Sequence, residues 1–132
     1  MVSRISKPAC RWIGILLLAV AAAGWMDGPV VGRHGWIGAD EAMSMAHACL
    51  GVFLLLMSFG GESTCAFALY AASVIIVSFA GYALYQMGSY DNLRMFDAAY
   101  AWRSGEYFHL ALGLTMAVCG KMNTARKQLW RE

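Results

Sequence analysis

The chain has 132 residues, of which 60% are hydrophobic and 14% are charged, and its formal net charge is +2. A soluble domain carries about 25% charged residues, and so small a chain cannot bury this much apolar surface in a core of its own. We therefore expect a single integral membrane domain over residues 1–132, covered by the lipid bilayer. The slight positive charge, without a basic cluster among aromatic residues, excludes nucleic acid as an expected partner.

Four apolar runs, separated by polar segments, predict four transmembrane helices. They cover residues 12–26, 41–59, 65–87 and 106–120. The first run would extend only about 22 Å as a helix, against a hydrocarbon core of about 30 Å, so residues before it should lie in the interface. A cleaved signal peptide is the alternative for this run, because a basic start precedes a Leu-rich centre and three alanines. We favour a retained helix, since Trp25 and Met26 continue the run past the potential cleavage site.

The polar segments predict two loops and one surface helix. Residues 27–40 contain four glycines and a proline, which predicts a non-helical loop, and residues 60–64 predict a tight turn. In residues 88–105, the apolar residues Leu93, Phe96 and Tyr100 share one helical face. This spacing predicts a short amphipathic helix on the membrane surface, with a plain surface loop as the alternative. The expected fold is thus all-α, a four-transmembrane-helix bundle with a short interfacial helix between the third and fourth spans.

The distribution of basic residues predicts the orientation of this bundle. Four spans place both termini on the same side of the membrane. The ends of the chain hold seven basic residues: Arg4, Lys7, Arg11, Lys121, Arg126, Lys127 and Arg131. The polar segments on the other side hold only Arg33, Arg94 and Arg103. Because basic residues are retained in the cytoplasm, we expect both termini to be cytoplasmic.

Two histidines within the spans are the candidate functional residues. His47 and His109 are each followed four residues later by a glycine, Gly51 and Gly113, which lies on the same helical face. The second and fourth spans run in the same direction, and helix rise places the histidines about 9 Å and about 4.5 Å below the outer ends of these spans. Because an ionisable residue in a span is costly and usually has a partner inside the bundle, we expect the two to lie at similar depth.

Three interpretations of this pair are open. In the first, the histidines hydrogen-bond across helices, and the glycines allow the helices to approach closely. In the second, the imidazoles are axial ligands of haem b or of a chlorophyll-type pigment, and the glycines make room for the macrocycle. In the third, Glu106 and His109 belong to a metal site, because a carboxylate and an imidazole at i and i+3 share a face. The second span has Ser44 where a matching glutamate would stand.

The same motifs resemble those of a family of small bacterial four-helix membrane proteins without an assigned activity. Its members have a glycine-rich end to the first span, a His-x-x-x-Gly second span and a fourth span that opens with an Asn-x-x-His-Leu-x-x-Gly-like motif. Residues 22–26, 47–51 and 109–113 follow this layout, and the resemblance covers most of the chain. Glu106 replaces the asparagine, and Met43 replaces a further histidine of the family. The resemblance implies a four-helix bundle and supplies no activity.

The sequence contains no nucleophile–base constellation and no phosphate-binding loop. We therefore expect a protein of the bacterial inner membrane that has no catalytic activity of its own. The first hypothesis is an accessory or structural subunit of a larger membrane protein complex, or of a homo-oligomer. The alternative is a haem b- or (bacterio)chlorophyll-binding subunit of a respiratory or photosynthetic electron-transfer complex, and a further alternative is a small transporter.

Overall fold

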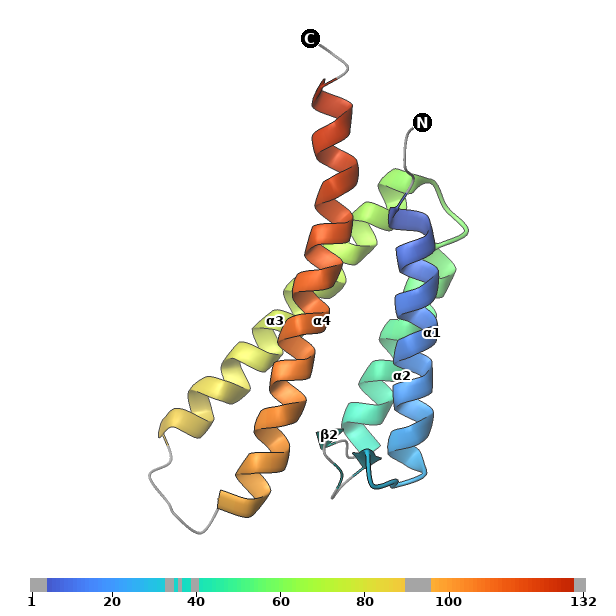
Figure 1. The fold of residues 1–132 in the computed structure, drawn as a ribbon. Helices are drawn as coiled ribbons and strands as arrows, with labels where there is room; N and C mark the ends of the chain where they lie inside the picture. The colour runs from blue at the N-terminus through green and yellow to red at the C-terminus, as the bar shows by residue number, and fades with distance from the viewer. Residues whose placement is uncertain (1–4, 33–34, 36, 39–40, 90–95, 130–132) are drawn as a thin grey trace.

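The computed structural model describes residues 5–32, 35, 37–38, 41–89 and 96–129, and it shows four helices and one short pair of strands in this part of the chain (Figure 1). The elements in order are α1 (Ser6–Trp25), β1 (Val31–Gly32), β2 (Ile37–Gly38), α2 (Glu41–Met57), α3 (Glu62–Ser89) and α4 (Phe96–Leu129). The prediction of an all-α protein with four helices is confirmed.

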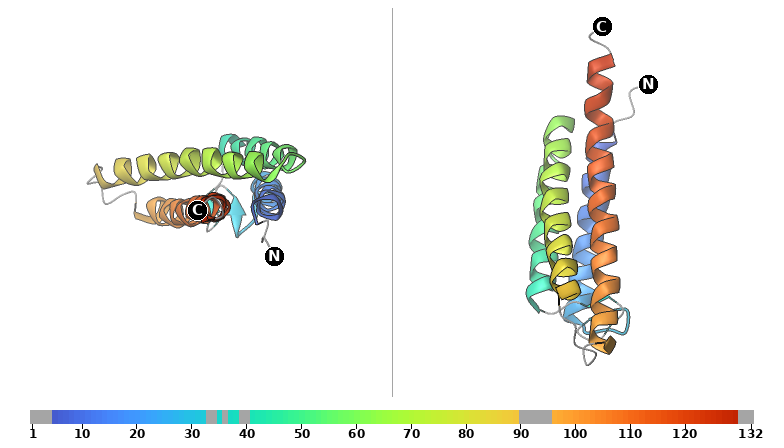
Figure 2. Two further views of the ribbon diagram at one scale, coloured as in Figure 1. Left: turned by 90° about the horizontal axis from the view of Figure 1, so that it is seen from above. Right: turned by 90° about the vertical axis from the view of Figure 1, so that its left-hand side faces the viewer.

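The helices are arranged as two antiparallel hairpins. α1 packs along α2, and α3 packs along α4, while contacts between the two hairpins are fewer. α3 crosses α4 at a slant, so that the far end of α3 lies away from α1 and α2 (Figure 2). α1 begins and α4 ends at the same end of the bundle, where the Ser6 hydroxyl donates a hydrogen bond to the Cys119 carbonyl at 3.3 Å. The interface between the hairpins is therefore the less extensively packed part of the fold.

All four helices contribute to one apolar core. Its fully buried side chains include Leu17 of α1, Leu54 of α2, Leu69 of α3 and Met116 of α4. A second, smaller cluster lies under the loop that joins α1 to α2, where Val31 and Ile37 pack with Val20 and Phe108. The loop is thus held by apolar contacts against the C-terminal part of α1 and against Phe108 in the N-terminal half of α4.

α1 begins at Ser6, earlier than the apolar run that predicted it. Pro8 lies in the first turn, where its missing N–H would have no helical partner, so it does not prevent this early start. With 20 residues, α1 is about 30 Å long, enough to match the hydrocarbon core of a bilayer. The expected shortfall of the first span therefore does not occur.

The loop between α1 and α2 contains no helix among its described residues, as predicted for residues 27–40. β1 and β2 pair in parallel, with Val31 opposite Ile37 and Gly32 opposite Gly38. The Ile37 N–H donates to the Val30 carbonyl at 2.9 Å, which closes the loop on itself.

The prediction of a separate interfacial helix over residues 88–105 is wrong. α4 is a single helix of 34 residues, about 51 Å long, and residues 96–105 form its first turns. Gly105 is buried within it and does not interrupt it, because an interior glycine costs only about 1 kcal/mol relative to alanine. Leu93, Arg33 and Arg94 lie outside the described residues.

Two helices of the described chain are long and apolar enough to cross a membrane. They are α1 and the segment Glu62–Tyr82 of α3. α2 is also apolar, but its 17 residues extend only about 25 Å.

Candidate functional site

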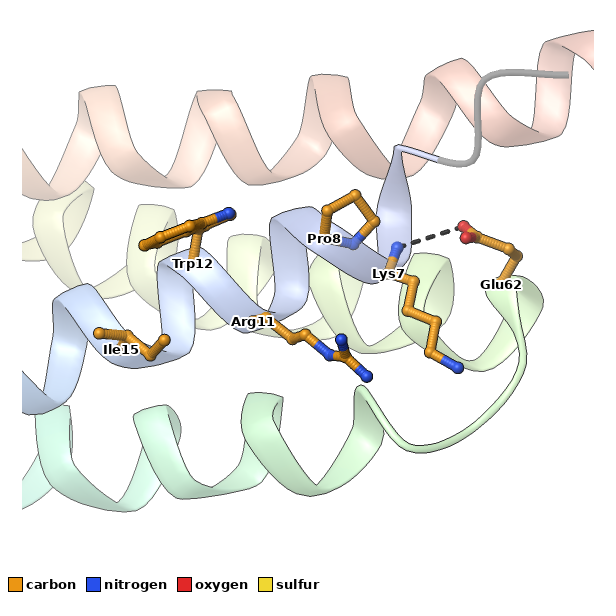
Figure 3. A pocket seen from close by; sticks show the side chains of 6 residues that line it. All are labelled: Lys7, Pro8, Arg11, Trp12, Ile15 and Glu62. Atoms are coloured by element: carbon orange, nitrogen blue, oxygen red, sulfur yellow. Dashed lines mark hydrogen bonds between the residues drawn. The ribbon is translucent and has the colours of Figure 1, made fainter. Parts of the chain in front are cut away.

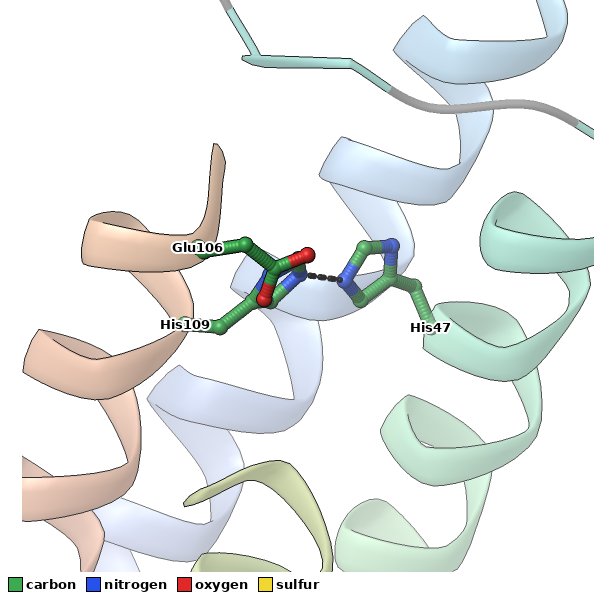
Figure 4. Close-up of polar contacts among 3 residues, drawn as sticks. All are labelled: His47, Glu106 and His109. Atoms are coloured by element: carbon green, nitrogen blue, oxygen red, sulfur yellow. Dashed lines mark hydrogen bonds and ion pairs between the residues drawn. The ribbon is translucent and has the colours of Figure 1, made fainter. Parts of the chain in front are cut away.

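His47 of α2 and His109 of α4 meet inside the bundle (Figure 4). Their Nε2 atoms are 2.9 Å apart, and the two residues are only 4% and 6% exposed. One histidine comes from each hairpin, so the contact bridges the interface between the hairpins. The structure thus brings together the two residues that the sequence singled out.

The two imidazole rings lie nearly end to end. Their planes are inclined by 22°, and their centroids are 5.1 Å apart. This separation exceeds that of the Nε2 atoms by close to the width of one imidazole ring, so each Nε2 points toward the other along a common line. In two neutral imidazoles, one Nε2 then donates an N–H and the other accepts it.

Glu106 lies one turn before His109 and is also buried, at 7% exposure. Its Oε2 is 3.6 Å from Nδ1 of His109, on the same face of α4. A carboxylate beside Nδ1 favours the tautomer that carries its proton there. Nε2 of His109 is then the acceptor, and Nε2 of His47 is the donor.

On the other side of the His47 ring, the Nδ1 atom has no hydrogen-bond partner among the described residues. Nδ1 of His47 and the hydroxyl of Ser44 are both buried, and neither has a hydrogen-bond partner within the described residues. Ser44 lies one turn before His47 on the same face of α2, and its hydroxyl does not hydrogen-bond to the ring. In the sequence, Ser44 is notable only as the position where a glutamate of a second Glu-x-x-His pair would stand. Its i−3 spacing from His47 was the signal that places it here.

Each glycine of the paired motif contacts a neighbouring helix. A Cβ on Gly51 would lie 2.9 Å from the Gly14 carbonyl oxygen of α1, and a Cβ on Gly113 would lie 2.6 Å from a Val77 methyl group of α3. The Ser73 hydroxyl donates a hydrogen bond to the Gly113 carbonyl oxygen at 2.8 Å, and this bond stabilises the contact between α3 and α4. In this structure, α1 therefore packs against the helix surface at Gly51, and α3 packs against the helix surface at Gly113.

Phe108 covers the His109 side of the histidine pair. The Phe108 ring meets the His109 ring edge to face, with centroids 5.8 Å apart and an interplanar angle of 64°. Phe108 also packs against Val20 and Val31, which connect the loop between α1 and α2 to the site. This loop and the end of α1 therefore help to keep water from the imidazoles.

A bare metal ion would have few protein ligands here. No group of three or more His, Cys, Asp or Glu residues in the described ranges is placed to hold an ion. All four cysteines are free. The thiols of Cys10 and Cys65 donate to backbone carbonyl oxygens, those of Cys65 at 3.5 Å and Met57 at 3.3 Å.

A pocket at the surface lies where α1 and α3 begin (Figure 3). It is a pocket of about 450 Å³ lined by Lys7, Pro8, Arg11, Trp12, Ile15 and Glu62. The backbone N–H of Lys7 donates to Glu62 Oε2 at 3.2 Å, which connects the two helix starts. The exposed cation of Arg11 and the exposed indole of Trp12 suit the interface between a membrane and water.

Comparison of the chain with protein-family models, curated proteins and solved structures gives no match. The resemblance to a small bacterial four-helix family therefore stays a prediction.

Proposed function

We propose that this chain is a small non-enzymatic subunit of a larger membrane complex, and that all four of its helices cross the bacterial inner membrane. The observation that carries the proposal is the outer surface of the helices. Large apolar side chains are exposed on every helix, including Trp12, Ile15, Val52, Leu56, Phe67, Val74, Phe79, Leu114 and Val118. An apolar surface of this extent is unsuited to water and suited to lipid or to a partner helix.

Charged and aromatic residues support four spans with both termini in the cytoplasm. Lys7 and Arg11 lie at the start of α1, and the Ser6–Cys119 contact brings Lys121 of α4 to the same end. The exposed Tyr85 and Tyr107 lie toward the other end, where an aromatic belt is expected. α2 is the shortest helix, and local thinning of the bilayer accommodates such a helix at modest cost.

A small-residue stripe on α2 supports a partner within the membrane. Ala42, Ala46 and Cys49 are exposed and recur at spacings of four and three residues, so they form one outward face. Small side chains do not improve packing against lipid chains, whereas they allow a neighbouring helix to approach this face closely. This face is where we place the contact with the larger complex.

Site-specific photo-crosslinking tests this assignment. A photoreactive amino acid at Ala46 should give a discrete adduct in native membranes, and mass spectrometry then identifies its second component. The matched control is the same substitution at Leu114, which is exposed on α4 and should give no discrete adduct. Purification of only the lone chain in mild detergent, together with no adduct from position 46, would contradict the proposal.

A further inference from the structure

The pocket where α1 and α3 begin combines two cationic side chains with an exposed apolar wall. We propose that it binds one anionic phospholipid, with the phosphodiester of the headgroup against Lys7 and Arg11 and an acyl chain along Trp12 and Ile15. This inference rests on the proposed membrane location and goes beyond it, because it assigns a ligand of defined chemistry to one end of the bundle.

The pocket residues of α1 follow the order of the polar and apolar parts of a phospholipid. Lys7, Arg11 and Ile15 recur at intervals of four residues, so they lie along one side of the helix. Helix rise places Ile15 about 12 Å from Lys7, further from the end of the bundle. A lipid that lies parallel to α1 therefore has its headgroup beside the cations and its acyl chain beside the apolar residues.

The two cations are placed to share one anion. The side chains of Lys7 and Arg11 extend to the same side of α1 (Figure 3). No ion pair between either of them and a carboxylate occurs among the described residues. Like charges four residues apart on a helix repel each other, and a phosphate between them would remove this repulsion. The guanidinium of Arg11 can also bind a phosphate group through two parallel hydrogen bonds.

The backbone of the first turn leaves the anion to these side chains. The Lys7 N–H donates to Glu62 Oε2 at 3.2 Å, and Pro8 has no N–H to offer. The Ala9 N–H donates to the Ile5 carbonyl oxygen at 3.0 Å. The binding of a phosphate here should therefore depend on the charges of Lys7 and Arg11.

The net charge of the pocket matches that of a phosphodiester. Glu62 is the one carboxylate of the lining, and it accepts the backbone N–H of Lys7. Two cations and one carboxylate leave a single positive charge in excess, whereas a phosphodiester carries a single negative charge. Basic pockets of this kind on the cytoplasmic side of membrane helices bind anionic headgroups.

The apolar wall of the pocket is open to the bilayer. The Trp12 side chain is 72% exposed and the Ile15 side chain is 49% exposed. An indole one turn below a cation suits the boundary between headgroups and acyl chains. The pocket volume of about 450 Å³ lies within the range of about 300–1,000 Å³ that is typical of small-ligand sites.

Native mass spectrometry of the detergent-purified full chain tests the proposal. The chain is titrated separately with phosphatidylglycerol, phosphatidylethanolamine and phosphatidylcholine that carry the same acyl chains. We expect one phosphatidylglycerol to bind first, at least about fivefold more tightly than either zwitterionic lipid. Lys7→Gln and Arg11→Gln should each weaken its binding about fivefold. The matched control is Lys121→Gln, which removes an exposed cation of α4 at the same end of the bundle and should leave the binding unchanged.

Two further measurements separate the parts of the ligand. Trp12→Ala should weaken all three lipids alike and keep the preference for the anionic headgroup, because the indole contacts the apolar part. Soluble glycerol phosphate, at the same concentration as the lipid, should not displace phosphatidylglycerol, because it has no acyl chain. Displacement by glycerol phosphate would show a site for free phosphate and would overturn the lipid assignment.

Other outcomes would overturn the site itself. They are equal binding of the three lipids, tighter binding of phosphatidylethanolamine, and an equal loss of binding in Lys121→Gln and Arg11→Gln. Extraction of native membranes with alkaline carbonate tests the membrane location separately. A chain that stays in the extracted membrane but shows no lipid preference would contradict the lipid site alone, whereas a chain released by carbonate would contradict the proposed function.

Discussion

Gly14 of α1 and Gly51 of α2 face each other so closely that a Cβ atom on either would lie within 3.0 Å of the carbonyl oxygen of the other. The backbones of the two helices are therefore in direct contact at this point. Close approach through small residues is a main source of helix association in membranes. The contact orients the face of α2 that carries His47, because His47 lies one turn before Gly51.

This contact predicts opposite effects for two glycine substitutions. Gly51→Ala places a methyl group 2.9 Å from a backbone oxygen, and such overpacking costs about 1–3 kcal/mol. Gly81→Ala in α3 meets nothing within 4 Å, so it should stabilise the protein by about 0.5–1 kcal/mol through helix propensity. Unfolding in mixed micelles, followed by far-UV circular dichroism, measures both effects. Equal stabilisation by the two alanines would show that α1 and α2 do not meet at Gly51.

Ser73 should contribute more to stability than Thr115, although each donates a hydrogen bond at 2.8 Å to a backbone carbonyl. The hydroxyl of Ser73 reaches across from α3 to Gly113 of α4, whereas Thr115 bonds within its own helix. Ser73→Ala should cost about 0.6–1.7 kcal/mol, the range for hydrogen bonds between membrane helices. Thr115→Ala, as the matched control, should change the free energy of unfolding little. A larger loss from Thr115→Ala than from Ser73→Ala would contradict the α3–α4 packing.

The histidine pair should show energetic coupling. His47→Leu or His109→Leu alone leaves one buried imidazole nitrogen without its partner, at a cost of about 1–3 kcal/mol. The double substitution removes both polar groups, so it should cost less than the sum of the two single changes. A double-mutant cycle on the free energy of unfolding measures this coupling. Strictly additive losses would mean that the two rings do not interact.

The elements were largely predictable, because apolar runs and their polar separators are local features of the sequence. The ends of the helices were not, and α4 shows the reason. Its predicted span stopped at polar residues, but polar residues do not end a helix unless they favour another local structure, and α4 continues from Phe96 to Leu129. The early start of α1 has the same origin, since Ser6 and Pro8 are compatible with a first turn.

The site was predictable as a set of residues and not as a geometry. Two parallel spans with a histidine near the outer end of each indicated a pair at similar depth. Whether the rings would meet depends on how the α3–α4 hairpin sits against the α1–α2 hairpin, which is a long-range property. The role of Gly14 was not predictable for the same reason, because it depends on the packing of α1 against Gly51 of α2.

The central claim is that the chain crosses the membrane an even number of times, with both of its ends in the cytoplasm, as the four-span bundle requires. Protease digestion of a chain with a different epitope tag at each end tests it most directly. We predict that both tags survive digestion of spheroplasts and that both are removed in inverted membrane vesicles. Removal of one tag in spheroplasts would show an odd number of spans, and loss of the N-terminal tag before digestion would show that the first helix is cleaved as a signal peptide. Either result would contradict the four-span bundle.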